Sequence, residues 1–349
     1  MQSIRIGARS IGAGLPVYVV AELSANHLQR FERAAEIVRQ AAAAGADAVK
    51  LQTYTPDTIT LDADGPLFRI GGKTPWEGER LYEIYRRAHT PWEWQPQLVA
   101  LARELGIECF SAPFDASAVD FLEGLAVPAF KIASFELVDL PLIERCARTG
   151  KPLILSTGMA SLDEIGDAVA AARAAGDGGV ALLKCTSAYP SPPDALNLRS
   201  IAALAERFSV PVGLSDHTLD VEVVVAAVAL GACIVERHVT LNRADGGPDA
   251  SFSLEPAELA AMVRAIRLTE RALGAPHFGP SEAEREMLRF RRSLFVVRNL
   301  RAGERVTAEH VRSVRPGAGL APKHLSAVIG RCATRDLTAG DPLAWEDLA

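Results

Sequence analysis

The stretches VPVGLSDHT, residues 210–218, and CIVERHVT, residues 233–240, decide the fold. Each is a short apolar run that ends in charged and polar residues, and an amphipathic stretch of helical character separates the two. A strand, a helix and a second strand in this order place the two strands parallel in one sheet. The polar ends of both runs then lie at the same edge of that sheet.

The same pattern repeats along the chain. Six earlier apolar runs precede these two, namely VYVVAE (17–22), AVKLQT (48–53), IECFSA (107–112), AFKIAS (129–134), PLILST (152–157) and VALLKCT (180–186). Glycines at 45, 106, 150 and 231 mark the ends of helices just before the next strand. Eight repeats in about 260 residues predict a (β/α)₈ TIM barrel rather than an open sheet. The first run lacks a GxGxxG motif, which counts against a dinucleotide-binding fold.

Two further segments stand out. Residues 53–90 form a long, aromatic connection, and on the active face of a barrel such a loop covers substrate. We expect five of its aromatic residues to exclude water, with helix packing as the alternative for the last two: Trp76, Tyr82, Tyr85, Trp92 and Trp94. We assign residues 1–275 to the catalytic barrel, 276–290 to a linker with a short helix, and 291–349 to a small, mostly β domain. With about 60 residues, that domain has little core of its own.

The composition of the chain argues against some classes of binding partner. The net charge of −6 argues against nucleic acid or an anionic membrane as the main partner. No apolar run reaches the roughly 18 residues of a membrane span, and the first residues lack the apolar segment of a signal peptide. The five cysteines are scattered without a CxxC pair, as expected of reduced thiols in a cytoplasmic protein.

Two histidines fall at neighbouring strand ends. His217 ends the seventh apolar run and His238 ends the eighth. Two imidazoles with open positions suit an exchangeable divalent metal, manganese before magnesium or cobalt, better than structural zinc. The alternative is one hydrogen-bonded histidine and one acid–base histidine.

Lysines and hydroxyls occupy the other strand ends. Lys50 and Lys131 follow apolar runs, where an unpaired ammonium is costly. With nearby serines they suit a phosphate or carboxylate, and STGMAS (156–161) adds a predicted helix start with a glycine. The alternative is that both lysines pair with Glu22 and Glu236 in an ion network.

These motifs together resemble a known family. AELSANH (21–27), KLQTYTPDT (50–58), FKIASFE (130–136), LSTGMAS (155–161), GLSDHT (213–218), ERHVT (236–240) and GPDASFS (247–253) are similar to the nonulosonic acid synthases, the sialic acid synthase family. The segment from residue 292 to 320 resembles that family's antifreeze-like SAF domain. ELSANH, the long loop and SAYPSP (187–192) are most similar to the branch that makes pseudaminic acid. The segment Asn26-His27-Leu28-Gln29 departs from the NHNG spacing of sialic acid synthases.

The resemblance implies an activity. Members of that branch condense phosphoenolpyruvate, water and 2,4-diacetamido-2,4,6-trideoxy-L-altrose into pseudaminic acid and phosphate, as domain-swapped homodimers. Synthesis of N-acetylneuraminic or legionaminic acid is the first alternative, and a non-catalytic sugar-binding protein is the second.

The resemblance also implies residue roles. Glu22 and Glu136 match catalytic carboxylates, and His217 and His238 match metal ligands with a part in catalysis. Positions that match phosphoenolpyruvate contacts are Lys50, Lys131, Ser134, Ser156, Ser187 and Ser215. Positions that match sugar contacts are Gln52, Tyr189, Asp249 and Arg315, of which Arg315 comes from the partner's SAF domain.

Overall fold

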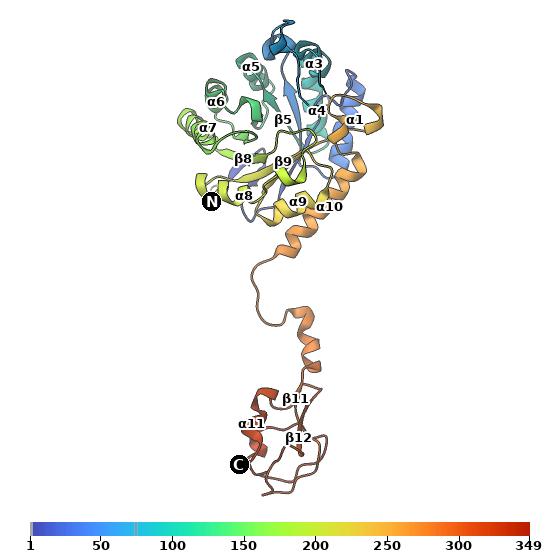
Figure 1. The fold of residues 1–349 in the computed structure, drawn as a ribbon, viewed down its shortest axis with the longest axis vertical. Helices are drawn as coiled ribbons and strands as arrows, with labels where there is room; N and C mark the ends of the chain where they lie inside the picture. The colour runs from blue at the N-terminus through green and yellow to red at the C-terminus, as the bar shows by residue number, and fades with distance from the viewer. Residues whose placement is uncertain (1–2, 73, 75) are drawn as a thin grey trace. The chain divides into compact units, whose positions relative to one another are not determined.

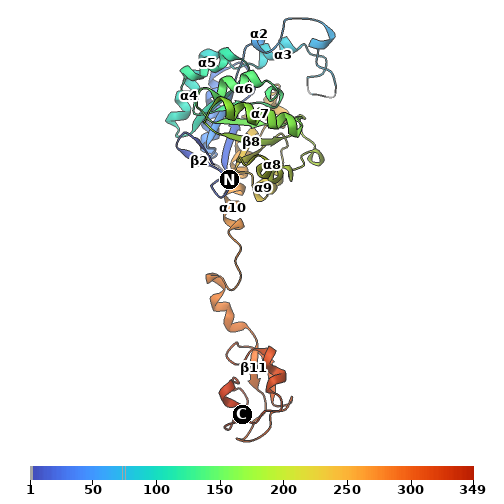
Figure 2. The same ribbon diagram turned by 90° about the vertical axis from the view of Figure 1, so that its left-hand side faces the viewer.

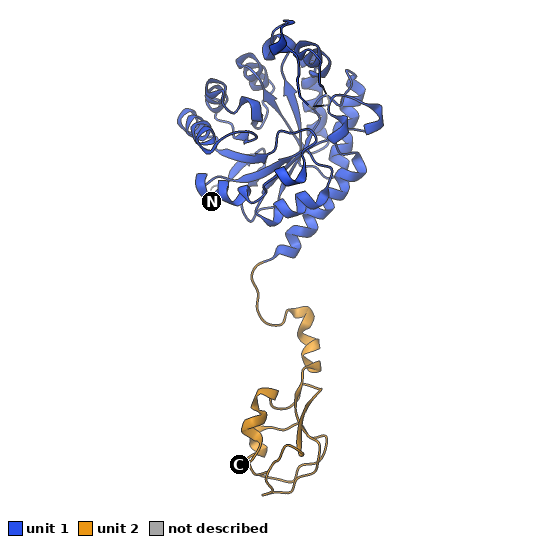
Figure 3. Ribbon diagram, in the orientation of Figure 1, with its two compact units in different colours: residues 1–274 blue, residues 275–349 orange. Residues whose placement is uncertain are grey.

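A computed structural model describes residues 3–72, 74 and 76–349. The chain divides into two compact units, one that ends at Gly274 and one that begins at Ala275 (Figure 3). The boundary lies within one residue of the end predicted for the barrel. Each unit has its own buried core.

The first unit is a closed barrel of eight parallel strands (Figure 1). In chain order the strands are β3 (Tyr18–Glu22), β4 (Ala48–Thr53), β5 (Glu108–Pro113), β6 (Phe130–Ile132), β7 (Leu153–Ser156), β8 (Val180–Cys185), β9 (Val212–Asp216) and β10 (Ile234–His238). Each strand pairs with the next, and β10 closes the ring on β3. All eight predicted strands are confirmed, and so is the TIM barrel.

A helix follows each strand and packs on the outside of the barrel. These helices are α1 (Phe31–Ala43), α4 (Gln95–Glu104), α5 (Ala116–Gly124), α6 (Leu140–Ala147), α7 (Leu162–Ala175), α8 (Ser200–Phe208), α9 (Val221–Ala229) and α10 (Pro256–Leu273). The four predicted helix-end glycines, 45, 106, 150 and 231, all have positive φ angles, a conformation that glycine adopts without strain. None of the helices in the described residues is long and apolar enough to cross a membrane.

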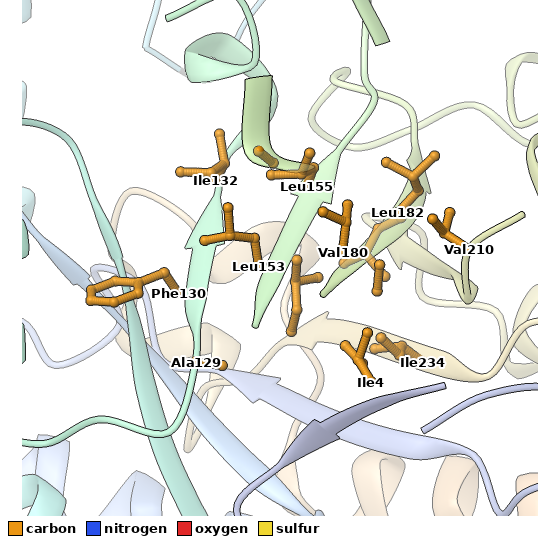
Figure 4. Close-up of a cluster of buried hydrophobic side chains, with 14 of the residues drawn as sticks. Ile4, Ala129, Phe130, Ile132, Leu153, Leu155, Val180, Leu182, Val210 and Ile234 are labelled. Atoms are coloured by element: carbon orange, nitrogen blue, oxygen red, sulfur yellow. The ribbon is translucent and has the colours of Figure 1, made fainter. Parts of the chain in front are cut away.

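A short hairpin closes the amino-terminal end of the barrel. Strands β1 (Ile4–Ile6) and β2 (Arg9–Ile11) pair antiparallel, and their isoleucines are buried in the barrel core. Figure 4 shows Ile4 beside Ile234 in this cluster of apolar side chains. The sequence analysis did not predict this hairpin. It leaves the carboxyl ends of the strands as the open end of the barrel.

The long connection between β4 and α4 contains α2 (Pro56–Ile59) and α3 (Leu81–Ala88). Both helices lie at the end of the barrel away from the amino-terminal hairpin (Figure 2). An antiparallel bridge between Arg69 and Arg80 folds the segment back on itself. Lys73 and Pro75, which belong to the predicted covering loop, lie outside the described residues.

The second unit begins with a 3₁₀ helix, η7 (Glu282–Phe290), followed by the antiparallel pair β11 (Ser293–Val296) and β12 (Val311–Val314). Isolated bridges join most of its other extended segments, and α11 (Leu325–Val328) is its short helix. Ten buried apolar residues, from Leu294 to Leu348, form its core. The prediction of a short helix followed by a mostly β domain agrees with this arrangement.

Candidate active site

The strand register gathers the predicted polar residues inside the barrel. Glu22 of β3 lies opposite Lys50 of β4 and opposite His238 of β10. Glu236 lies opposite Ser215 of β9. Residues opposite one another in parallel strands point to the same face, so these side chains share the barrel interior. Glu22, Lys50, Ser215 and Glu236 are all at most 5% exposed.

The two lysines are bound to carboxylates. The Lys50 ammonium lies 2.5 Å from Glu22 Oε2 and 3.6 Å from Glu236 Oε1. Lys131 donates to Glu236 Oε1 at 2.9 Å, and the Ser215 hydroxyl donates to the same oxygen at 3.3 Å. This is the ion network that the sequence left as an alternative. Burial alone would raise the pKa of Glu236, but Lys131 and Lys50 lower it below its usual range.

A small cradle lies beside this network, between β6, β7 and β8. The Gly158 amide donates to Ser134 Oγ at 3.2 Å. A Cβ at position 158 would lie 2.2 Å from Ser187 Oγ and 2.7 Å from Ser134 Oγ. Both hydroxyls therefore approach the backbone of Gly158 so closely that a side chain would not fit there. The Ser156 hydroxyl is buried and has no hydrogen-bond partner among the described residues. The Ser156 hydroxyl is therefore an unfilled donor for an anion, and the Ser134 and Ser187 hydroxyls lie close to Gly158 in the same cradle.

The helix that was expected to add to this cradle begins later than predicted. α7 starts at Leu162, and Ser161 caps it through a hydrogen bond from the Glu164 amide at 3.2 Å. The Glu164 carboxylate in turn accepts from the Ser161 amide at 2.7 Å. The prediction that Ser156 stands at the start of this helix is therefore wrong, because four residues lie between Ser156 and the cap.

His217 and His238 face each other at the mouth of the barrel, with ring centroids 5.2 Å apart. The Nδ1 of His217 lies 3.2 Å from the Thr186 carbonyl, a bond that holds the proton on Nδ1 and leaves Nε2 as an acceptor. Burial lowers the pKa of His217 to about 4 and lowers the pKa of His238 well below its usual range. Both imidazoles are therefore neutral at pH 7.

His238 has an unfilled polar atom. Its Nδ1 is buried, lies 3.9 Å from Asp249 Oδ2 and has no hydrogen-bond partner in the part of the chain that the structure describes. Within residues 3–72, 74 and 76–349, no three His, Cys, Asp or Glu side chains gather as a metal cluster. The protein ligands available to a metal ion at the mouth of the barrel are thus the two imidazoles.

Glu136 lies at the end of the 3₁₀ turn η3 (Ser134–Glu136), which follows β6. Its Oε2 is buried without a hydrogen-bond partner. Burial raises the pKa of this carboxyl to about 7. The group can therefore accept or give a proton near neutral pH.

Three of the predicted sugar contacts surround the histidines. Gln52 donates to Glu22 Oε1 at 3.1 Å, and Asp249 accepts a hydrogen bond from the Ser24 hydroxyl. The Tyr189 ring lies 4.5 Å from the His217 ring and 5.3 Å from the Phe252 ring. The fourth, Arg315, is an exposed residue of the second unit, directly after β12.

The aromatic residues of the long loop divide into two groups. Trp76 reaches the mouth, where its Nε1 donates to the Pro248 carbonyl at 3.0 Å and its ring lies 5.6 Å from Tyr189. Tyr85 packs on Tyr54, but Tyr82 bonds Asp57 at the surface. Trp92 packs on Phe121 and Trp94 on His27 and Phe31. For these two tryptophans the helix-packing alternative is therefore the correct one.

Sequence reasoning missed several residues that shape the site. Gly158 belongs to the STGMAS motif, but its contact with two serines depends on loops that follow different strands. The role of Ser24 was not predicted because its hydrogen-bond partner, Asp249, lies 225 residues further along the chain. Asp216 and Arg237 alternate with the inward residues of β9 and β10, and that alternation was the available signal.

Comparisons with known proteins agree with this architecture. A model of the NeuB family matches residues 37–277, and a model of the SAF domain matches residues 291–349. The chain is 44% identical to a pseudaminic acid synthase of Helicobacter pylori, over 95% of this chain and 98% of that protein. It is 35% identical to an N,N'-diacetyllegionaminic acid synthase of Legionella pneumophila, over 98% and 97%.

Solved structures point the same way. An N-acetylneuraminic acid synthetase of Leptospira borgpetersenii, solved in complex with citrate, superposes with a TM-score of 0.73 at 31% identity. That superposition covers 82% of this chain and 95% of the other. The chain belongs to the NeuB family and carries a SAF domain at its carboxyl end.

Proposed function

We propose that this chain condenses phosphoenolpyruvate with 2,4-diacetamido-2,4,6-trideoxy-L-altrose and water, giving pseudaminic acid and phosphate. The observation that carries the proposal is the identity of 41–44% to pseudaminic acid synthases along 95% of the chain. Identity to legionaminic acid synthases is lower, at 33–35%. The expected product is pseudaminic acid, and legionaminic acid and N-acetylneuraminic acid are the alternative products.

The cradle suits the phosphate and carboxylate of phosphoenolpyruvate. Lys50 and Lys131 supply positive charge, and the hydroxyls of Ser134, Ser156 and Ser187 supply directional donors. Both lysines are paired in the structure, so the charge of the network is balanced before the anion arrives. An anion that binds Lys131 would share its ammonium with Glu236. The ion pair between Lys131 and Glu236 would then be weaker.

The bond between the two substrates forms from the methylene carbon of phosphoenolpyruvate to the aldehyde carbon. Water adds to the carbon that bears the phosphate, the carbon–oxygen bond to phosphate breaks, and the aldehyde oxygen takes a proton. A base must therefore remove a proton from water. Glu136, with its unpartnered oxygen and its raised pKa of about 7, is suited to that role.

The residues at the mouth fit a divalent metal. Two neutral imidazoles face each other, His217 is oriented by a carbonyl behind it, and His238 has a buried nitrogen without a partner. We propose that His217 and His238 hold the ion, manganese before magnesium or cobalt, with water or substrate as its other ligands. When bound, such an ion stabilises negative charge on a carbonyl oxygen.

The sugar is expected to lie beside the histidines. Trp76, Tyr189 and Phe252 make an apolar wall there, which suits the methyl groups of a 6-deoxy sugar with two acetamido groups. Polar partners for the sugar are Gln52, which is bonded to Glu22, and Asp249, whose Oδ2 lies 3.9 Å from His238 Nδ1.

We also propose that the protein is a homodimer. Large apolar side chains are exposed on the two loops that the Gly158–Ser134 hydrogen bond joins, where Phe135 is 60% exposed and Met159 is 63% exposed. Such a patch beside an active site is typical of a surface that a protein partner covers. A second copy of the chain, with Arg315 at the sugar, is the partner that the family resemblance implies.

Phosphate release tests the proposed function. The full chain is incubated with phosphoenolpyruvate, Mn²⁺ and one of three sugars: 2,4-diacetamido-2,4,6-trideoxy-L-altrose, the corresponding legionaminic acid precursor, or N-acetylmannosamine. We expect release with the first sugar and its loss with EDTA. Turnover with N-acetylmannosamine alone would contradict the proposed substrate, and turnover that survives EDTA would contradict the metal.

A further inference from the structure

We propose that Asp216 and Arg237 are positioning residues that fix His217 and His238 relative to each other from outside the barrel. The inference rests on the proposed metal-binding role of those histidines. Neither residue contacts the interior of the barrel, because side chains alternate along a strand and their neighbours Ser215, His217, Glu236 and His238 point inward.

The two residues join the strands that carry the histidines. Arg237 of β10 lies directly opposite Asp216 of β9, and its Nη1 forms an ion pair with Asp216 Oδ2. Its Nη2 donates to the Thr218 carbonyl. Arg237 therefore contacts the residue before His217 and the residue after it.

Asp216 also accepts two hydrogen bonds from Thr218. Its Oδ1 accepts from the Thr218 amide at 3.1 Å, and its Oδ2 accepts from the Thr218 hydroxyl at 2.9 Å. The backbone on both sides of His217 is thus tied to one carboxylate and one guanidinium. Because that guanidinium belongs to the residue before His238, a shift of one histidine is transmitted to the other.

The cost of this arrangement indicates a purpose other than stability. Both side chains are 1% exposed, and a buried ion pair often stabilises a fold no better than apolar residues of the same size. Within the described residues the Arg237 Nε has no hydrogen-bond partner, and a cavity of about 240 Å³ borders the side chain between α9 and α10. Packing therefore does not confine Arg237 on that side, and its polar bonds to Asp216 and Thr218 define its place.

The test compares Mn²⁺ affinity in four full-length proteins. They are the parent, the double variant Asp216→Leu with Arg237→Met, the single variant Arg237→Lys, and the control Arg267→Met. The control removes a partly buried ion pair with Asp47 at the opposite end of the same barrel. Free Mn²⁺ is measured by electron paramagnetic resonance, and urea unfolding is measured in parallel.

We expect the double variant to bind Mn²⁺ about 10- to 100-fold more weakly than the parent, as for other residues that orient metal ligands. It should unfold near the urea concentration of the parent, because apolar residues replace both charges. Arg237→Lys, which keeps the charge but loses the two-pronged contact, should be intermediate and folded even if the double variant is not. The control should bind like the parent.

A double variant or an Arg237→Lys variant that binds Mn²⁺ as tightly as the parent overturns the inference while the proposed metal site stands. A parent that binds no Mn²⁺ overturns the metal site and the inference with it. The two failures are thus distinguishable in one experiment.

Discussion

The two candidate catalytic carboxylates, Glu22 and Glu136, lie in different surroundings. Glu22 is fully buried, and burial raises its pKa, but its Oε1 accepts from Gln52 and from the Ser24 amide and its Oε2 forms an ion pair with Lys50. Glu136 keeps a buried oxygen without a partner. A base for water needs a free lone pair and a pKa near the working pH. Of the two, Glu136 meets both conditions, and Glu22 is better suited to holding Lys50 and Gln52.

The pKa of Glu136 predicts a pH profile. Burial raises it to about 7, so the carboxyl is protonated and inactive as a base below that pH. The rate should therefore rise as the pH increases through about 7. Glu136→Gln should lower kcat by about 10²- to 10⁴-fold and remove the rise. Glu144→Gln, on the exposed surface of α6, is the control, and an unchanged profile in Glu136→Gln would exclude Glu136 as the base.

The ion network predicts an effect on stability. Lys131→Met leaves Glu236 with Lys50 at 3.6 Å as its remaining ammonium. We expect a loss of about 3 kcal/mol in the free energy of unfolding, measured with urea, because a buried carboxylate loses a partner. Lys184→Met is the matched control, since Lys184 bonds the Cys185 carbonyl rather than a carboxylate. Equal losses in the two variants would show that the network adds nothing beyond packing.

The long loop between β4 and α4 reaches the mouth of the barrel through Trp76, whose ring lies near Tyr189. The Trp76 indole donates to the Pro248 carbonyl, next to Asp249. Trp76→Phe keeps an aromatic ring but loses this bond. A net hydrogen bond of about 1 kcal/mol predicts a roughly fivefold fall in kcat/KM for the sugar.

Trp92→Phe is the control for that measurement. Trp92 also donates through Nε1, to the Tyr54 carbonyl at 3.2 Å, but its ring packs on Phe121 outside the mouth. It should leave kcat/KM unchanged. If Trp92→Phe lowers kcat/KM as much as Trp76→Phe does, the loop acts through its general stability and not through closure of the mouth.

The eight strands and their helices were predictable because each strand is a distinct apolar run, and a helix-end glycine precedes four of them. The β1–β2 hairpin was not, because three-residue strands such as Ile4–Ile6 carry almost no periodicity. The identities of most site residues followed from their place at strand ends. The pairing of Lys131 with Glu236 was one of two alternatives that the sequence left open. The hydrogen bonds from Gly158 to Ser134 and from Ser24 to Asp249 did not follow from the sequence, because they depend on geometry across elements.

At the scale of the whole molecule, the proposal joins the second unit of one chain to the barrel of another. Arg315→Ala should then lower activity strongly while the barrel stays folded, as judged by circular dichroism. Arg298→Ala, in the same unit and paired with Glu309, is the control. A near-normal rate for Arg315→Ala would remove the second unit from catalysis.

Complementation tests whether Arg315 acts on the other chain. Subunits of the inactive variants Arg315→Ala and Lys131→Met are mixed by co-expression. In an exchanged dimer, one site of each mixed pair contains both intact residues, so about one quarter of all sites regain activity. If Arg315 serves its own barrel, no mixed dimer has an intact site and activity stays absent.

We propose that the chain selects a 6-deoxy sugar with two acetamido groups. The most direct measurement places phosphoenolpyruvate, Mn²⁺ and equal concentrations of the three candidate sugars in one reaction and identifies the products by mass spectrometry and chromatography against standards. The ratio of products then gives the ratio of kcat/KM values. We predict that pseudaminic acid is the dominant product. A mixture dominated by N-acetylneuraminic or legionaminic acid would contradict the account.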